Sequence, residues 1–221
     1  EEQNPDGFGL NAEAAILWQM LAFRLGDSNW FAGGAYRFMN TQTSFDFDGE
    51  IPGVENDALD SNNAAIAVVL VYDSLDNSFT PSEGLYSDLQ YARFDQAVGG
   101  DFDYGQLTWL NQAHLSFADD WSLGLRVDVD SVNGDAPFYA VPFINLKGIP
   151  AMRFQGENVI STEARLNWTF HPRWQVAGFV GAGRTTDDSF SDLGSAPSQT
   201  SKGMGFRYMA VKRLGINLGL D

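Results

Sequence analysis

Apolar and polar residues alternate with a period of two along most of the chain, which is the repeat of a β-strand and not of a helix. In the segment 121–130, every odd-numbered residue is apolar, and the even-numbered residues are polar or glycine. The segment 159–170 alternates in the same way and carries Glu163 and Arg165 on its polar face. The pattern therefore predicts an all-β fold in which each strand has one apolar and one polar face.

Turn residues divide the pattern into about ten predicted strands. Their ranges are 12–24, 29–46, 64–73, 84–97, 102–117, 121–130, 159–170, 174–186, 202–213 and 216–221. Short turns alternate with longer polar stretches at 47–63, 131–157 and 187–201. Short turns at one end and long loops at the other are typical of outer-membrane barrels. We therefore expect a single domain over 1–221, an antiparallel up-and-down transmembrane β-barrel.

Alternation alone also fits a soluble ligand-binding β-barrel, whose apolar face would point inward. Three features favour the membrane: strands longer than the soluble average, aromatic residues near strand ends such as Trp121 and Trp168, and charges along the second face. Aromatic residues gather at the interface between membrane and water. The charged residues expected to line a wet lumen are Arg126, Asp128, Arg165 and Arg207.

Charge and composition exclude several classes of function. The 221 residues include 13 Lys+Arg, 29 Asp+Glu and no Cys, which gives a net charge of −16. This balance argues against nucleic acid as a partner, and the lack of Cys excludes thiolate metal sites. We expect acidic loops and an acidic lumen, which would disfavour anionic solutes.

Candidate chemistry is sparse. The two histidines, His114 and His171, are accompanied by no recognisable hydrolase signature. The acidic runs 46–50 and 73–76 do not fit the spacing of a calcium loop. We therefore expect no enzymatic activity, no cofactor and no metal. The longest apolar run, 64–72, is shorter than the roughly 18 residues of a membrane-spanning helix.

Several segments carry a family resemblance. Residues 73–86 resemble the D-x-R-D-N-x-x-x-P-x-x-G turn of the BamA/TamA-type outer-membrane barrels, also called the bacterial surface antigen family, with Leu75 at the Arg position. The matching residues are Asp73, Asp76, Asn77, Pro81 and Gly84. Residues 146–168 are similar to the R-G-[FY] loop motif of that family and its next strand, and 178–184, 203–208 and 214–216 follow its last strands in order. Together the resemblance covers about residues 66–221.

The resemblance implies a barrel of 12 to 16 strands in which the loop 131–157 folds toward the lumen. In the family, the loop arginine meets the aspartate of an F-x-D-x-G strand, whereas this chain has Lys147 at the first position and Gly181 at the second. Lysine does not replace a bidentate arginine, so the family contact cannot form unchanged. Arg153 is available as a substitute donor and Glu163 as a substitute acceptor, and the sequence leaves open whether Lys147 or Arg153 makes the contact. The residues expected in this loop contact are Lys147, Gly148, Arg153, Gly156 and Glu163.

The resemblance also implies an integral protein of the outer membrane of a Gram-negative bacterium, which assembles outer-membrane proteins or translocates polypeptides. The expected partners are outer-membrane lipid and lipopolysaccharide, and a polypeptide substrate or partner chain. The alternatives are a plugged, cation-preferring channel or structural barrel, and the soluble ligand-binding barrel. Because the chain stops at Gly219-Leu220-Asp221 without a terminal aromatic residue, we expect a barrel that is incomplete at both ends.

Overall fold

Ten antiparallel strands form one sheet in chain order, so the expected all-β, up-and-down arrangement is confirmed. The computed structural model describes residues 10–45, 60–211 and 216–220. The strands are β1 (Leu10–Arg24), β2 (Trp30–Phe45), β3 (Ser61–Asp73), β4 (Gly84–Phe94), β5 (Tyr104–Ala118), β6 (Trp121–Gly134), β7 (Asn158–His171), β8 (Trp174–Thr186), β9 (Gln199–Val211) and β10 (Ile216–Leu220). Three short 3-10 turns, η2 (Gln96–Val98), η3 (Phe138–Ala140) and η4 (Phe190–Gly194), lie in the connections.

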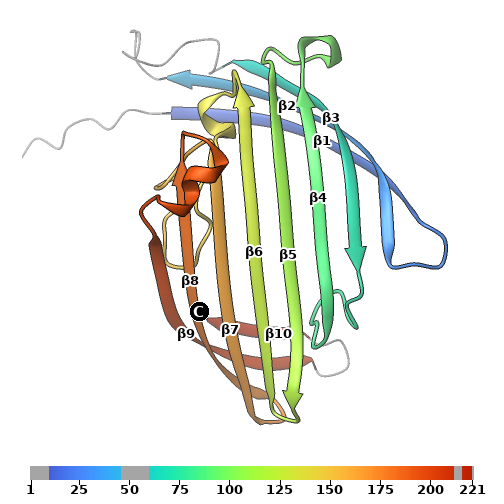
Figure 1. Cartoon of the computed structure of the whole chain (residues 1–221), viewed down its shortest axis with the longest axis vertical. Coiled ribbons are helices and arrows are strands. Elements are labelled where there is room, and N and C mark those ends of the chain that lie inside the picture. The colour runs from blue at the N-terminus through green and yellow to red at the C-terminus, as the bar shows by residue number, and fades with distance from the viewer. Residues whose placement is uncertain (1–9, 46–59, 212–215, 221) are drawn as a thin grey trace, which may run out of the picture.

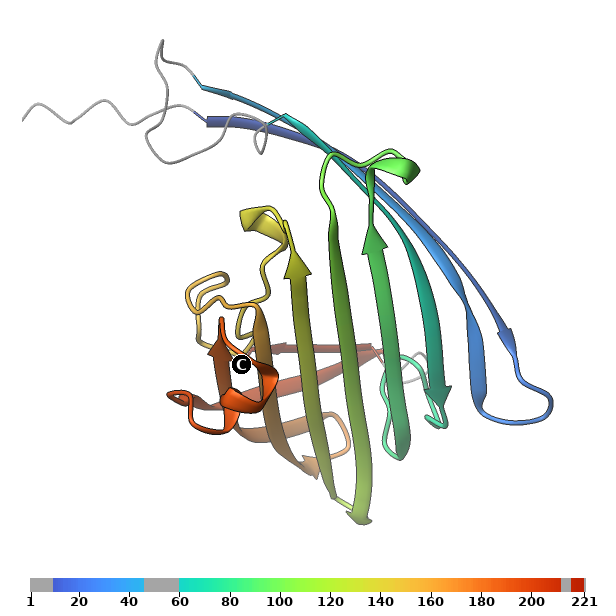
Figure 2. The same cartoon turned by 45° about the horizontal axis from the view of Figure 1, so that its top comes forward.

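The sheet curls around a hollow but does not close within the described residues, where β1 and β10 form its two edges (Figures 1 and 2). The connections 95–103, 135–157 and 187–198 lie at one end, called here the long-loop end. The turns 25–29, 74–83, 119–120 and 172–173 lie at the other, the short-turn end. In the described part of the chain, no helix is long and apolar enough to cross a membrane.

Three strands extend further into the polar stretches than the alternation predicts. β3 begins at Ser61, opposite Thr41, and β6 continues to Gly134, opposite Tyr104. β9 begins at Gln199. The expected loop 131–157 is therefore shorter and begins after Gly134. The regular alternation stops earlier because these strand ends are mostly polar or glycine, while their backbone pairing continues.

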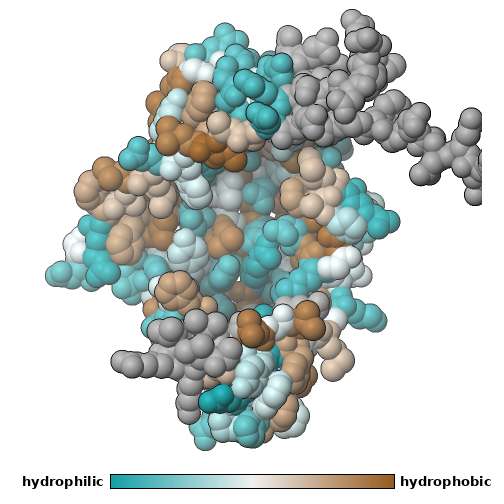
Figure 3. Space-filling model, turned by 180° about the vertical axis from the view of Figure 1, so that it is seen from behind, coloured by the Kyte–Doolittle hydropathy of each residue, from teal (hydrophilic) through white to brown (hydrophobic). Residues whose placement is uncertain are grey.

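The register assigns each strand residue to one of two walls. Arg37 of β2 contacts Gln90 of β4 and Gln106 of β5 across the intervening strands, so this face is the concave wall. The opposite, convex wall exposes large apolar side chains, including Val68 at 64% and Met204 at 76%. Figure 3 looks into the hollow from behind, where hydrophilic residues gather. Large apolar side chains thus cover the outer wall, as in a membrane barrel, although a small apolar cluster around Ala67 and Ala92 also packs on the concave wall. The soluble barrel with an apolar interior is wrong.

Aromatic side chains form a belt on the convex wall at the short-turn end. Trp30 lies 4.9 Å from Tyr72, measured between ring centroids, and Trp174 lies 4.5 Å from Tyr208. Trp121 and Trp168 stack at 5.6 Å. Each pair joins two adjacent strands, and this placement is that of an interfacial girdle.

The two walls predict opposite responses to a new charge. Val68→Arg places a cation at the middle of the convex wall and should destabilise the protein in lipid vesicles by about 2–4 kcal/mol. Leu110→Arg is the control, because Leu110 lies on the concave wall opposite Asp88 and Asp128. Urea unfolding followed by tryptophan fluorescence measures both. An equal loss of stability in the two variants would contradict the assignment of the walls.

Candidate functional site in the lumen

The connection 135–157 folds back over the concave wall of β7 and β8. It forms a small hairpin of its own, in which the Ile144 amide donates to the Phe154 carbonyl at 3.0 Å and the Gly156 amide to the Pro142 carbonyl at 3.1 Å. A bridge between Phe143 and Gln155 continues this pairing. Because these backbone groups are paired within the loop, the loop can leave the sheet without losing its hydrogen bonds.

Two glycines of β8 provide the seat for this hairpin. Ile144 and Leu146 are 1% and 4% exposed. A Cβ atom at Gly183 would lie 2.5 Å from Cγ2 of Ile144, and one at Gly181 would lie 2.9 Å from Cδ2 of Leu146. Side chains at these two positions would therefore displace the loop.

An ion pair fastens the loop beside this seat. Nζ of Lys147 lies 2.8 Å from Oε1 of Glu163 on β7 and 4.8 Å from the ring centroid of Phe179 on β8. The Glu163 side chain is only 9% exposed. Glu163 pairs directly with Gly181 across the two strands. Glu163 thus supplies the carboxylate, as expected, from the strand next to Gly181, the position that carries it in the family pattern.

Arg153 does not contribute to this contact. Its side chain is exposed, and its guanidinium lies 5.4 Å from the ring centroid of Phe154. Of the two donors that the sequence left open, Lys147 and not Arg153 makes the contact with the Glu163 carboxylate. Gly148 allows the turn next to Lys147 with a φ of 78°, and Gly156 lies so close to Thr185 that a Cβ atom would clash.

The four charged residues predicted for the lumen all lie on the concave wall. Arg126 pairs with the carboxylate of Asp128 and lies opposite Glu163. Nε of Arg165 donates to Oδ1 of Asn167 at 2.9 Å, and Arg207 lies between Gln175 and Gly219 in the register.

The concave wall is mixed in charge. Its described strands carry Arg37, Arg126, Arg165, Arg207, Asp88, Asp128, Asp130 and Glu163. The expectation of an acidic lumen is therefore wrong for this wall. Many further acidic residues lie in the connections, for example Asp101 and the pairs at 119–120 and 187–188.

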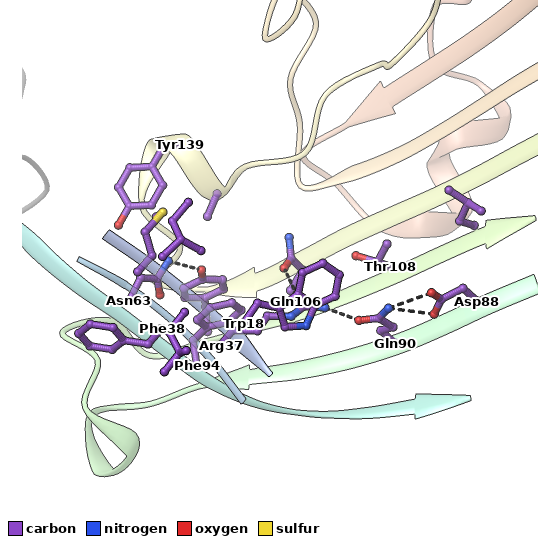
Figure 4. A pocket seen from close by; sticks show the side chains of 16 residues that line it. Trp18, Arg37, Phe38, Asn63, Asp88, Gln90, Phe94, Gln106, Thr108 and Tyr139 are labelled. Atoms are coloured by element: carbon purple, nitrogen blue, oxygen red, sulfur yellow. Dashed lines mark hydrogen bonds between the residues drawn. The ribbon is translucent and has the colours of Figure 1, made fainter. Parts of the chain in front are cut away.

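A cavity of about 560 Å³ lies between η3 and the concave wall (Figure 4). The guanidinium of Arg37 lies 5.8 Å from the ring centroid of Trp18 and donates to the side-chain carbonyls of Gln90 and Gln106. Nε2 of Gln90 donates to both carboxylate oxygens of Asp88, at 2.9 and 3.0 Å. The Gln90 amide therefore links the Arg37 guanidinium of β2 to the Asp88 carboxylate of β4. Aromatic rings, side-chain amides and a guanidinium thus all line the same cavity.

Sequence reasoning missed this cavity. Arg37 stands alone as a cation within the predicted strand 29–46, which is a signal that something on the same wall satisfies it. Its partners, Gln90 and Gln106, are uncharged and lie on other strands. Only the register brings them together.

The predicted turn residues build a hydrogen-bonded connection at the short-turn end. The Asp76 carboxylate accepts from the amides of Ser82 at 2.9 Å and Glu83 at 3.1 Å and from the Ser82 hydroxyl. Oδ1 of Asn77 accepts from the Phe79 amide at 2.8 Å. Oδ1 of Asp73 accepts from the Leu75 amide at 3.0 Å, Pro81 lies within the same turn, and Gly84 has a φ of 115°.

These bonds to the charged form lower the pKa of Asp76 from 3.8 to about 2, with the Ser82 hydroxyl as the largest cause. Asp73 and Asp76 therefore serve the turn. The described residues contain no group of three or more side chains arranged to hold a metal ion, and the acidic run 46–50 lies outside them.

The comparisons with known proteins identify relatives of this arrangement. A model of the Omp85 superfamily domain matches residues 21–144. The chain is similar to the crystal structure of BamA from Haemophilus ducreyi lacking POTRA domains 1-3, with a TM-score of 0.67 and 12% sequence identity. This match covers 91% of this chain and 49% of that chain, so the chain spans about half of it. No curated protein matches. The structural likeness concerns the fold, and the loop seat on β7 and β8 lies beyond the residues matched by the family.

The loop contact predicts which cation matters. Lys147→Met should lower the free energy of unfolding by about 2 kcal/mol, because it leaves the Glu163 carboxylate buried without its cation. Arg153→Ala should change it by less than about 0.5 kcal/mol. Adding Glu163→Gln to Lys147→Met should cost less than the sum of the two single changes. Urea titrations in vesicles of Lys147→Met, Glu163→Gln, their double variant and Arg153→Ala measure these free energies. A larger loss of stability in Arg153→Ala than in Lys147→Met would assign the contact to Arg153.

The turn predicts a pH dependence at the acid end. Because the folded-state pKa of Asp76 lies below its ordinary value, its contribution to stability is present above about pH 4 and is lost as the pH falls toward about 2. Asp76→Asn should lower stability at pH 7 and should flatten the dependence between these two values. Asp27→Asn, in the exposed β1–β2 turn, is the control. Unfolding midpoints in urea at pH 7, 4 and 2.5 measure the effect, and parallel curves for wild type and Asp76→Asn would contradict it.

Proposed function

The chain belongs to the Omp85 superfamily, and from this premise we propose that its outer-membrane barrel assembles outer-membrane proteins or translocates polypeptides, without catalytic chemistry. The observation that carries the proposal is the fastened loop. Ile144, Leu146 and Lys147 hold the connection 135–157 against β7 and β8 within the hollow. A loop that fills part of the lumen obstructs free diffusion of solutes, and its few contacts allow release.

The concave wall gives further support for a polypeptide as the partner. Rings, side-chain amides and the Arg37 guanidinium line the cavity beneath η3 (Figure 4). Amide side chains pair with peptide groups as donors and as acceptors. The mixed charge of the wall suits a neutral or variable chain better than an ion of one sign.

The second candidate is a plugged channel. It is favoured by the charged groups that line the concave wall, such as Arg126 and Asp128. Because cations and acids are both present there, such a channel would select weakly between cations and anions. The earlier expectation of a cation-preferring channel rested on the net charge, much of which lies in the connections.

A depletion experiment in the native host separates the two candidates. Depleting the full-length protein should remove particular barrel proteins or exported polypeptides from the outer-membrane fraction, as measured by quantitative mass spectrometry. Lys147→Met should restore them only in part, whereas Arg153→Ala should restore them fully. An unchanged outer-membrane proteome, together with altered uptake of small solutes, would overturn the proposal in favour of the channel.

A further inference from the structure

From β2 to β9 the convex wall carries very few charges, and all of them are positive, whereas the acidic Glu13 lies on the edge strand β1. Among the described residues of β2 to β9, the charged side chains on this wall are Arg93, Arg184 and Lys202. Each lies within a few residues of the long-loop end of its strand. In a chain of net charge −16, this selection of cations at one rim indicates an anionic ligand on the lipid side.

The three cations differ in how they are satisfied. Arg93 lies 3.8 Å from a carboxylate oxygen of Asp95 and 3.6 Å from one of Asp103. Arg184 donates to the carbonyls of Leu193 and Gly194 in η4. Lys202 makes no hydrogen bond or ion pair with any described residue. An unpaired lysine on a lipid-facing wall is costly, so a counter-charge from outside the chain would relieve that cost.

A furrow passes beside Lys202. It consists of three shallow hollows of about 440, 400 and 480 Å³ on the convex wall of β6 to β9. Neighbouring hollows share residues, which makes the furrow continuous from Arg184 to Gly178. Its floor consists of Thr162, Ala164, Gly178, Val180 and Ala182, and its sides of Leu123, Leu125, Val127, Lys202 and Met204.

The dimensions of the furrow fit an acyl chain. The six residue steps from Gly178 to Arg184 on β8 span about 20 Å at the usual rise of a strand. With a strand tilt of about 40°, this corresponds to about 15 Å of depth, which is half of a hydrocarbon core of about 30 Å. The furrow therefore crosses one leaflet, from the rim to the middle of the membrane.

The spacing of the cations indicates the kind of headgroup. Lys202 lies level with Val180 in the register, four residues below Arg184, or about 13 Å along the strand. The flexible stem of a lysine lets its ammonium reach toward the interface. Two separate cations near the interface fit a headgroup with two separate phosphates better than one with a single phosphate.

We propose that this furrow binds lipopolysaccharide of the outer leaflet, with one acyl chain along β7 and β8 and phosphates on Lys202 and Arg184. The inference rests on the proposed outer-membrane function, because in such barrels the long loops face outward and the rim of cations then lies in the outer leaflet. Lysine and arginine both bind phosphate through charge-assisted hydrogen bonds.

Two variants test the two halves of the site. Lys202→Gln removes the unpaired charge. Gly178→Leu fills the furrow and should fold, because a Cβ atom at Gly178 would meet nothing within 4 Å. Arg93→Gln is the matched control, a rim cation away from the furrow. Arg184 is left unchanged because it also holds η4.

The measurement is lipopolysaccharide bound per folded full-length protein, by native mass spectrometry and by titration with purified lipopolysaccharide in nanodiscs. Lys202→Gln should weaken binding about tenfold, as expected for one charge-assisted hydrogen bond, and Gly178→Leu should weaken it comparably, whereas Arg93→Gln should bind as wild type. Equal binding in all four proteins, or equal competition by phosphatidylglycerol, would overturn the proposal. The assay measures lipid bound to a folded barrel and does not depend on the assembly function. Loss of the lipid site would therefore leave the proposed assembly function intact, and loss of that function would leave the lipid site intact.

Discussion

In lipid, no backbone N–H or C=O group can remain unpaired, and the rest of this structure depends on that constraint. It requires neighbouring strands to pair within the membrane, and each strand from β1 to β9 pairs with the next strand along the chain. A fully paired strand can present only two faces, so the alternation of side chains divides the chain into a lipid wall and a lumenal wall. The functional groups then have one place to gather, the concave wall, and only the connections can add to it.

The loop seat shows how local chemistry works within this frame. Gly181 and Gly183 leave the concave wall without side chains where Leu146 and Ile144 arrive, and Glu163 places a carboxylate beside them for Lys147. Apolar contact positions the loop, and the ion pair orients it. The same wall holds Arg37 through neutral amides instead of a direct carboxylate. Two ways of satisfying a lumenal cation thus coexist, and only the first fastens a loop.

The fold could be predicted from the sequence because alternation is a local property. The strand ends could not be predicted, because Ser61 and Gly134 belong to strands only through their pairing with other strands. The acceptor Glu163 could be predicted from the sequence, but the donor was left open between Lys147 and Arg153. Choosing between two cations of one loop requires its path in space. Likewise, the net charge described the whole chain, whereas the register assigned charges of both signs to the concave wall and, from β2 to β9, cations alone to the convex wall.

Glu163 and Gly181 face each other across β7 and β8, so the carboxylate and the empty position are cross-strand neighbours. In the family pattern the carboxylate stands on the other strand of this pair. Exchange of the two roles preserves the charge at one point of the lumen while changing which strand supplies it. Across homologues, positions 163 and 181 should therefore covary as a pair. A larger side chain at 181 should accompany a smaller one at 146. The conservation of either position alone would understate how strongly the pair is constrained.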